Sequence, residues 1–398
     1  MKRVLIATAV PYWHRQKGNQ QRIFELVSFL AAHYSVTVFY MGQEQPPNDN
    51  LNVSYITTNP YGVWTDFAWR FLNWMPTRLR TRLIRMLNNL SYRRTIGAFY
   101  SARVADEFRR IYAANHYHAV VIEYIWYGFL ADAIDKDRSI SFLDVHDVFH
   151  KRVESFARFG RVPDKVVNEN EELGVYRKFD YLIAIQRVEF DYLNGLFPGK
   201  ALLAMHPQQA NPDIYGKRLD ALRPGDKLNL VYFGSFGDLN LDAVNWFVER
   251  VWSSDLADRF VLNIYGAICD ALTIDVPGIF IKGCIEDLRD AYRDADIAIN
   301  PIRFGSGLKI KNVEALAYGV PVVTTSVGAE GLEEGVDEFL LCADDADGFR
   351  AQIFKLADES MRRSISEKAL AFVSDKLTHE VCFGAIKQII DEEPSDRE

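Results

Sequence analysis

The fold of this chain is decided by the stretch NPIRFGSGLKIKNVEALAYGVPVVTTSVGAEGL, residues 300–332. The apolar run Ala295–Asn300, at its start, predicts a buried strand, and the glycine-rich segment 305–307 predicts a tight turn. Apolar residues then recur at helical spacing over Leu308–Tyr318, and a glycine and a proline end the helix. A second apolar strand, Val320–Thr325, follows. The order strand, turn, helix, strand is typical of an α/β sheet.

The turn and the helix also predict two neighbouring binding sites. A helix that begins at Ser306 or Gly307 would present its first N–H groups outward, at the positive end of the helix dipole. Lys309 and Lys311 add full positive charges, so a diphosphate would suit this place. Glu314 could accept two hydrogen bonds from a ribose diol. These features favour a nucleotide-sugar enzyme; the alternative is that Lys311 and Glu314 form an ordinary i,i+3 surface pair.

Length and composition limit the classes of protein. A chain of 398 residues predicts two domains. The net charge of −8 argues against non-specific nucleic-acid binding, which needs a broad basic surface. The four cysteines show no C-x-x-C spacing, so neither a zinc site nor a disulfide framework is predicted. Met1–Val10 is too short for a signal peptide and no long apolar run follows, so we expect a soluble cytoplasmic protein.

Strand and helix patterns alternate along the first half of the chain and begin again near residue 228. We therefore expect an N-terminal Rossmann-like domain over residues 1–205 and a C-terminal one over residues 219–375. The linker between them is predicted at residues 206–218, which are rich in proline and polar side chains. The last segment, 376–398, is predicted as a helix that packs back on the first domain. Two such domains facing across a cleft would place the ligand between them.

The C-terminal half resembles the GT-B glycosyltransferases, within the large retaining group 1 family that carries an E-x7-E motif. The resemblance rests on VYFGSFGDLNLDAVNWF (231–247), IKGCIEDLRDAYRDADIAINPIRFGSGLKIK (281–311) and EALAYGVPVVTT (314–325). It implies that Glu314 holds the nucleotide ribose, that the loop from Gly283 to Ile285 holds the base, and that the glycine turn holds the diphosphate. The donor-binding residues that we expect are Gly18, Asn19, Gly234, Ser235, Lys282, Gly283, Ile285, Arg303, Gly305, Ser306, Gly307, Leu308, Lys311 and Glu314.

The sequence departs from that family at two places. Ser306 stands eight positions before Glu314, where the family often has a glutamate that contacts the donor sugar, so this contact is weakened or moved. The loop GSFGDLNLD lacks the basic residues that often neutralise the diphosphate. We assign that role to Lys309, helped by Arg303 or Lys311, because GSGLKIK matches a subset of the family with basic residues in this helix.

The N-terminal half offers weaker candidates. The resemblance would let His146 or Asp147 contact the transferred sugar or the acceptor hydroxyl, whereas the alternative is a local helix cap formed by Asp147. Glu123 closes an apolar strand and is either a ligand in the cleft or a partner for a buried arginine. Gly18 and Asn19 correspond to a glycine loop near the donor phosphates in the family, or else form a flexible loop. The expected catalytic residues are His146, Asp147 and Lys309.

Residues 61–100 contain seven arginines, one acidic residue and several tryptophans in an otherwise acidic chain. This composition predicts contact with an anionic membrane surface that carries a lipid-diphosphate acceptor. Stacking of an acceptor glycan on the tryptophans and ordinary core packing are the alternatives.

Together these features predict a hexosyltransferase-type enzyme that needs no metal and no cofactor. It would move a sugar from a nucleotide-diphosphate sugar to a glycan or lipid-linked acceptor in surface polysaccharide or glycoconjugate synthesis, and the resemblance implies that the transfer proceeds with retention. Its expected place is the cytoplasm, at the inner face of the plasma membrane, and nucleic acid is not an expected partner. The alternatives are a sugar-nucleotide epimerase on the same fold and a non-catalytic subunit that binds sugar nucleotides.

Overall fold

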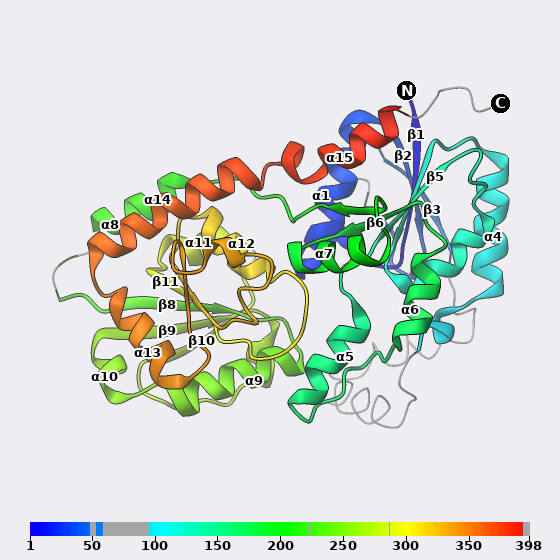
Figure 1. The fold of residues 1–398 in the computed structure, drawn as a ribbon. Coiled ribbons are helices and arrows are strands. Elements are labelled where there is room, and N and C mark those ends of the chain that lie inside the picture. Colours follow the sequence, from blue (N-terminus) through cyan, green and yellow to red (C-terminus); the bar gives the residue numbers. More distant parts are fainter. Residues whose placement is uncertain (48–52, 59–94, 222, 224, 286, 393–398) are drawn as a thin grey trace. The chain divides into compact units, whose positions relative to one another are not determined.

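The structure, a computed structural model, describes residues 1–47, 53–58, 95–221, 223, 225–285 and 287–392. The chain forms two compact units, each built around a parallel β-sheet (Figure 1). Unit 1 comprises Met1–Ile183, Phe197–Leu202 and Ile386–Glu398, and unit 2 comprises Ala184–Leu196 and Leu203–Ala385. The prediction of two Rossmann-like domains is confirmed.

Unit 1 contains a seven-stranded sheet of order β3-β2-β1-β4-β5-β6-β7. The central strands are uninterrupted apolar runs, as expected for strands that are covered on both faces. The strands are β1 (Arg3–Thr8), β2 (Ser35–Tyr40), β3 (Val53–Thr57), β4 (Ala119–Glu123), β5 (Ile140–Asp144), β6 (Tyr181–Ala184) and β7 (Ala201–Leu203).

The helices of unit 1 connect these strands. They are η1 (Tyr12–His14), α1 (Gly18–His33), η2 (Ile96–Phe99), α4 (Ala102–Ala114), η3 (Ile125–Ala133), α5 (Phe149–Arg158) and α6 (Glu169–Tyr176). The end of the last helix, α15 (His379–Glu392), also belongs to this unit. Lys2 Nζ donates to the Ile390 and Asp391 carbonyl oxygens at 2.7 and 2.9 Å, which ties this helix end to the start of the chain.

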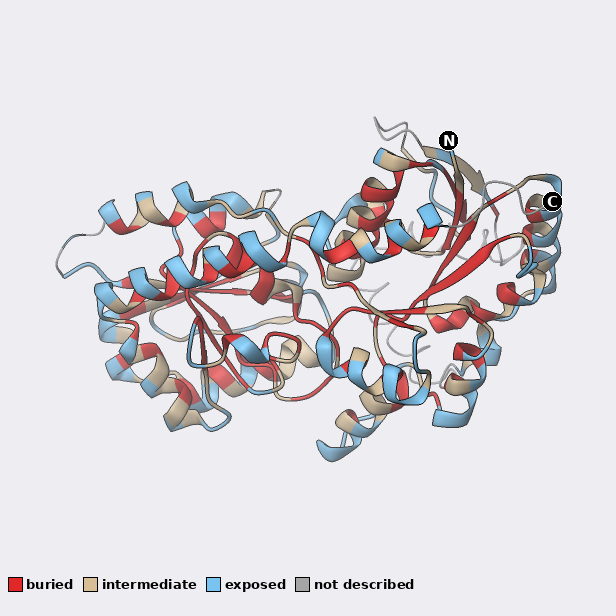
Figure 2. Cartoon of the chain, turned by 45° about the horizontal axis from the view of Figure 1, so that its top comes forward, coloured by how far each residue is buried: buried red, intermediate tan, exposed pale blue. Residues whose placement is uncertain are grey.

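Unit 2 contains a six-stranded sheet of order β10-β9-β8-β11-β12-β13. The strands are β8 (Leu228–Phe233), β9 (Phe260–Tyr265), β10 (Ile279–Gly283), β11 (Ile297–Asn300), β12 (Val322–Thr324) and β13 (Leu340–Cys342). In Figure 2 most strands of both sheets are buried, while the helices present exposed outer faces; the edge strands β3 and β10 are partly exposed.

Two groups of helices cover the sheet of unit 2 (Figure 1). One group consists of α8 (Pro212–Ala221), α11 (Leu288–Arg293), α12 (Ile310–Ala317) and α14 (Glu359–Lys376), which pack on one another. The other group consists of α9 (Asp238–Trp246), its π-helical continuation η4 (Phe247–Val251), α10 (Ser254–Arg259) and α13 (Ala346–Lys355). The remaining elements are α7 (Arg187–Leu196), η5 (Ala267–Ala271) and η6 (Glu333–Gly335).

The segment 206–218, expected as a linker, instead contains most of helix α8. Tyr215 is fully buried, and its hydroxyl donates to the Asp296 carbonyl oxygen at 2.9 Å. Arg218 forms a two-pronged ion pair with the Asp296 carboxylate at 2.9 and 2.8 Å. Tyr215 and Arg218 therefore anchor helix α8 to Asp296, the residue before β11, a role that composition alone does not reveal.

Most of the basic segment 61–100 lies outside the described residues, including the tryptophans and the arginines up to Arg94. Among the helices that are described, none is both long and apolar enough to cross a membrane.

Candidate functional site

The strand order of unit 2 reverses direction between β8 and β11. In an open parallel sheet, ligands bind at such a switch point, beyond the carboxyl ends of the strands. The loop after β8 begins at Gly234 and the loop after β11 runs from Pro301 to Lys309. The predicted diphosphate and ribose residues therefore lie at the edge of the sheet where a ligand is expected.

Three glycines close the carboxyl ends of adjacent strands in unit 2. Gly266, after β9, has φ 97°, and a Cβ there would lie 2.4 Å from the Gly234 carbonyl oxygen. Gly266 N donates to the Gly283 carbonyl oxygen at 2.8 Å. Glycine is therefore required at position 266, both for the left-handed backbone and for the close approach of the neighbouring loop. Gly266 thus contacts both Gly234 and Gly283, which were predicted as donor-binding residues, and it was not itself predicted.

The turn before α12 is built differently from the prediction. Gly305 and Gly307 have φ 118° and 77°, conformations that favour glycine. Helix α12, however, begins at Ile310 with Lys309 as its N-cap, two residues after the predicted start at Leu308. The first N–H groups of the helix thus belong to Ile310 and its successors, and the expectation that Ser306 or Gly307 starts the helix is wrong.

Lys309 faces the turn that it follows. Its ammonium donates to the carbonyl oxygens of Gly307 and Ser306 at 2.6 and 3.2 Å, and it lies 3.4 Å from the Glu330 carboxylate. The side chain is only 8% exposed. A lysine held in this way satisfies the carbonyl groups of a buried turn, so it fixes the turn's shape in addition to any charge that it offers a ligand.

Lys311 crosses from α12 to α9. Its Nζ donates to Asn240 Oδ1 at 2.8 Å and to the Tyr232 hydroxyl at 3.3 Å, and it lies 4.4 Å from the centre of the Tyr232 ring. Burial lowers the pKa of Lys311 to about 7; Glu314 opposes this shift, and Lys309 adds to it. The positive charge of Lys311 at neutral pH is therefore sensitive to an anion placed beside it.

Arg303 is held by a carboxylate from the opposite side of the switch point. Its guanidinium contacts both oxygens of Asp242 at 2.9 and 3.0 Å and lies 5.5 Å from the centre of the Trp246 ring. An arginine paired in this two-pronged way keeps a fixed orientation. Asp242 would therefore compete with a bound diphosphate for the Arg303 guanidinium.

Glu314 lies one turn into α12 and is 7% exposed. Beside it, Tyr292 and Tyr318 stack at 4.7 Å, and burial together with the Glu314 charge raises the pKa of Tyr292. Because Glu314 is buried and Lys311 donates to Asn240, the alternative of an exposed i,i+3 pair is wrong. A nearly buried carboxylate at a ligand-binding edge suits a ribose diol.

The other predicted donor residues of unit 2 differ in exposure. Gly234 and Leu308 are buried, whereas Ser235 and Lys282 are exposed. Lys282 Nζ lies 5.3 Å from the Phe280 ring, and Gly283 has φ 81°, just before the predicted base-binding residue Ile285.

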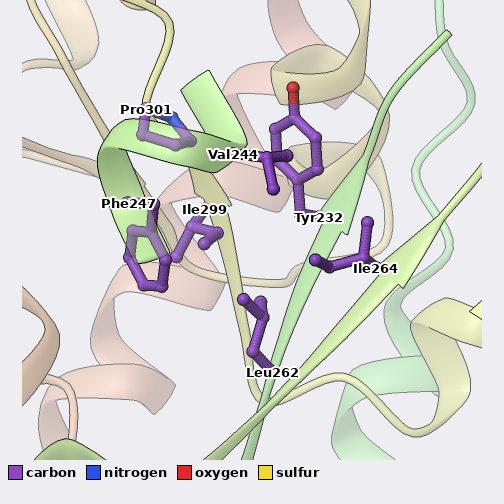
Figure 3. A pocket seen from close by; sticks show the side chains of 7 residues that line it. All are labelled: Tyr232, Val244, Phe247, Leu262, Ile264, Ile299 and Pro301. Carbon is purple, nitrogen blue, oxygen red and sulfur yellow. The ribbon is translucent and has the colours of Figure 1, made fainter. Parts of the chain in front are cut away.

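An apolar hollow lies beneath the switch point (Figure 3). Its lining consists of Tyr232, Val244, Phe247, Leu262, Ile264, Ile299 and Pro301. In Figure 3 the Tyr232 hydroxyl points away from the other lining side chains. These side chains carry no positive charge for a diphosphate. The hollow is therefore a gap in the apolar core below the site and is not the nucleotide site itself.

Unit 1 also places polar side chains at its switch point, between β1 and β4. Glu123 ends β4 and Asp144 ends β5, and each is 0% exposed. Glu123 Oε2 lies 2.7 Å from His146 Nε2, and Arg22 Nε of α1 donates to Asp144 Oδ2 at 3.1 Å. The direct acidic partner of the buried arginine is thus Asp144, while Glu123 contacts the histidine.

Two residues beside this cluster have unusual backbone conformations. Tyr124 and His146 have φ 71° and 61°, and their rings stack with centroids 3.8 Å apart. The Asn19 side chain, at the start of α1, forms a hydrogen bond with the Tyr124 hydroxyl. Left-handed backbone at two non-glycine residues is costly and is concentrated at functional sites. The structure therefore connects Asn19, one of the predicted donor residues, with His146; Gly18 is the first residue of the same helix.

Helix α5 is not capped by the residues proposed for that role. Its N-cap is Val148, and the Glu172 carboxylate accepts hydrogen bonds from Phe149 N and His150 N at 2.7 and 2.8 Å. Asp147 instead lies 3.5 Å from Arg152. The alternative that Asp147 only caps the next helix is therefore wrong.

Sequence reasoning missed several partners in both units. Asp144 interrupts an apolar run, which is a signal of a buried charge that needs a partner, whereas Arg22 directly follows the polar segment 18–21 and gives no such signal. The others lie on exposed-looking polar segments and give no such signal before the fold is known. These are Asn240, Asp242, Glu330 and Glu172.

Part of unit 2 is similar to a known family. Residues 227–359 match the family described as glycosyl transferases group 1. An uncharacterized 44.6 kDa protein in the cps region of Klebsiella pneumoniae is 31% identical over 225 residues, which cover 52% of this chain and 55% of that protein. The chain thus matches little more than half the length of this curated relative.

Three solved structures show the fold. Sucrose-phosphate synthase from Thermosynechococcus elongatus has a TM-score of 0.67 at 16% identity, covering 98% of this chain and 99% of that one. HepE from Anabaena, solved with UDP and glucose, has 0.66 at 11%, covering 99% and 100%. WaaG, a glycosyltransferase involved in lipopolysaccharide biosynthesis, has 0.61 at 13%, covering 98% and 100%. Residues 227–359 are therefore similar to the group 1 glycosyltransferases, and the chain as a whole shares the GT-B fold of two Rossmann-like domains.

Proposed function

We propose that this chain is a glycosyltransferase that moves a sugar from a nucleotide-diphosphate sugar to a glycan or lipid-linked acceptor. One observation carries the proposal: the buried Glu314 carboxylate and the glycine-rich turn lie together at the switch point of a group 1 glycosyltransferase domain. The carboxylate suits the ribose, and the turn and Lys311 suit the diphosphate. UDP is the first nucleotide to test, because HepE was solved with UDP and glucose.

The reaction that we propose proceeds with retention. The acceptor oxygen attacks the anomeric carbon on the face from which the diphosphate leaves, and the bond between that carbon and the diphosphate oxygen breaks. The acceptor proton passes to the departing phosphate oxygen, so no nucleophilic carboxylate is needed. Positive charge and N–H groups that face the diphosphate then supply the main stabilisation of the transition state. We propose that no metal ion takes part, which predicts full activity in EDTA.

The acceptor that we propose is part of surface polysaccharide synthesis. Support comes from the relative in the cps region and from the fold shared with WaaG, which acts in lipopolysaccharide biosynthesis. The arginine-rich segment 61–100 would hold the enzyme at an anionic membrane surface near a lipid-linked acceptor, each cation contributing about 1 kcal/mol.

Flotation with vesicles that contain anionic lipids tests the membrane step. Replacement of Arg78, Arg80, Arg82 and Arg85 by glutamine should release the protein from the vesicles, while neutral vesicles serve as the control. Failure of the wild type to bind at low salt would favour a water-soluble acceptor.

Product analysis tests the proposed function as a whole. The protein is incubated with radiolabelled UDP-, GDP- and ADP-sugars and with lipids and glycans extracted from the cell. We expect label in a glycan or lipid product, with the anomeric configuration of the donor. A changed sugar that stays on the nucleotide without any acceptor would show an epimerase. Nucleotide binding without any reaction would show a non-catalytic subunit. This alternative is motivated by Ser306, which stands where the family often has a glutamate that contacts the donor sugar.

A further inference from the structure

Four ionisable side chains form a buried group at the carboxyl ends of β4 and β5. Arg22, Glu123, Asp144 and His146 are 1%, 0%, 0% and 5% exposed. Arg22 bonds Asp144 at 3.1 Å, Glu123 bonds His146 at 2.7 Å, and one ligand atom from each of Glu123, Asp144 and His146 lies within 4.8 Å of the others. We call these four residues the buried tetrad.

The charges of the tetrad do not balance in their ordinary states. One guanidinium, two carboxylates and a neutral imidazole leave one net negative charge in the interior, which is costly unless it is neutralised. Two carboxylate oxygens, Glu123 Oε1 and Asp144 Oδ1, are buried without a hydrogen-bond partner among the described residues. Two cations lie outside the tetrad: Arg152 is paired with Asp147 at 3.5 Å, and Lys165 Nζ lies 5.8 Å from the centre of the Tyr124 ring. Both side chains are partly exposed to solvent, so their charges are screened from the buried carboxylates.

We propose that the tetrad holds one additional proton in the Glu123–His146 pair, so that His146 presents Nδ1–H as a hydrogen-bond donor. The pair then carries two protons. One lies between Oε2 and Nε2, because the 2.7 Å contact requires a proton. The other lies on Nδ1 and not on Glu123 Oε1, because Oε1 is fully buried and has no hydrogen-bond partner within the described part of the chain, whereas the imidazole keeps some exposure. Burial, and next the Asp144 charge, raise the pKa of Glu123, which supports uptake of this proton.

Glu123 is thus a positioning residue, and the proton that it retains decides which role His146 can play. An ionised Glu123 beside a neutral His146 would leave Nδ1 bare, and the ring would accept a proton. The neutral tetrad has the opposite consequence: the ring donates to an oxygen of the ligand, such as a sugar or phosphate oxygen. The identity of that ligand rests on the proposed function, while the protonation state does not.

A bound cation is the competing means of neutralising the tetrad. A metal ion would need the lone pair of His146 Nε2 and both carboxylates in their ionised form. Arg22 already lies at hydrogen-bond distance from Asp144 and supplies a positive charge there. We therefore assign the neutralising charge to a proton.

Nitrogen spectra of histidine test the assignment on the whole protein without substrate. Protein labelled with 15N at histidine gives long-range proton–nitrogen correlations that report protonation of each ring nitrogen, and His146→Gln identifies the signals of His146 among the eight histidines. We expect Nδ1 of His146 to be protonated at pH 7.5. A bare Nδ1 at that pH would overturn the proposal, as would signals that shift on addition of Zn²⁺ or Mg²⁺ and return with EDTA.

Two substitutions remove the charge imbalance by different routes. Glu123→Gln and Asp144→Asn each leave the tetrad neutral without the additional proton, so in each variant we expect the proton to be released and Nδ1 of His146 to be bare at pH 7.5. Asp144 has no direct bond to the imidazole, so an effect of Asp144→Asn separates charge balance from simple loss of a contact. His150, which bonds Glu172 in a separate pair, is the internal control and should not change. If either variant fails to fold, the wild-type spectrum still decides.

Transfer activity is measured separately. If His146 donates to a substrate, Glu123→Gln should lower kcat more than it raises KM for the donor, and the pH profile of kcat should change in the variants whose nitrogen spectra show a bare Nδ1. A protonated Nδ1 in a protein without transferase activity would support the additional proton and contradict the proposed function. Transferase activity with a bare Nδ1 would support the proposed function and contradict the additional proton.

Discussion

Lys311 Nζ lies 2.8 Å from Asn240 Oδ1, so that a lysine from α12 joins α9 across the switch point of unit 2. Asn240 Nδ2 in turn donates to the Ser235 carbonyl oxygen at 2.9 Å, in the loop after β8. The loop GSFGDLNLD therefore has a basic residue beside it after all, supplied by the other loop of the site. The positive charge that the family often places in the loop after β8 is supplied here by Lys311 of α12.

The lowered pKa of Lys311 predicts a specific dependence of stability on pH. Between about 7 and the ordinary value of 10.5, the unfolded chain binds more protons at this lysine than the folded chain does. The free energy of unfolding contributed by Lys311 therefore rises with pH across this window. The free energy of unfolding of Lys311→Met, measured by urea titration, should rise less between pH 7 and pH 10 than that of the wild type. Lys282→Met, at an exposed lysine, should follow the wild type; equal slopes for all three proteins would refute the lowered pKa.

Lys309 should act first on the shape of the turn. Lys309→Met removes the ammonium that satisfies the Gly307 and Ser306 carbonyl groups, and we expect a loss of about 1.5–3 kcal/mol in the free energy of unfolding. Nucleotide affinity should fall together with stability. The control Glu330→Gln keeps the ammonium and should cost about 1 kcal/mol or less. Full stability with a loss in kcat alone would instead support the role inferred from the sequence, in which Lys309 mainly stabilises the leaving diphosphate.

Glu172 should matter more for stability than Asp147. The Glu172 carboxylate is 0% exposed and accepts hydrogen bonds from two backbone N–H groups of α5, so Glu172→Ala should cost about 3 kcal/mol. Glu171→Ala, at the exposed neighbouring position, should change stability by less than about 0.5 kcal/mol. Thermal unfolding of both variants and of Asp147→Ala measures the difference. A loss in Asp147→Ala as large as in Glu172→Ala would show that Asp147 caps the helix.

Most strands of both sheets can be predicted from the sequence because they are local apolar patterns. The runs that form β1, β4 and β11 are apolar on both faces, and each is followed by a helical pattern. Shorter or more polar strands give a weaker signal, and β3, β7 and β13 were not predicted. The start of α12 was misplaced because Lys309 reaches back to the turn, a contact between residues that only the folded loop brings together.

The partners within the site depend on the fold in a way that spacing along the chain cannot show. Asn240 and Lys311 are 71 residues apart, and Arg22 and Asp144 are 122 apart. A charged residue inside an apolar run predicts that a buried partner exists, as with Glu123, but it does not identify the partner. Glu123 was expected to be either a ligand in the cleft or a partner for a buried arginine. In this structure Glu123 bonds the histidine, Arg22 bonds Asp144, and the Arg22 charge also acts to lower the pKa of Glu123.

The central claim is that Glu314 holds the ribose of a nucleotide, and a calorimetric double-mutant cycle tests it most directly. The wild type and Glu314→Gln are titrated with the tightest binder among UDP, GDP and ADP and with its 2′-deoxy form, and Glu249→Gln serves as an exposed control. We predict that Glu314→Gln weakens binding about 10- to 100-fold, that removal of the 2′-hydroxyl weakens wild-type binding similarly, and that the two losses together do not add. Unchanged affinity in Glu314→Gln, two losses that add independently, or no binding of any of the three nucleotides would contradict the assignment.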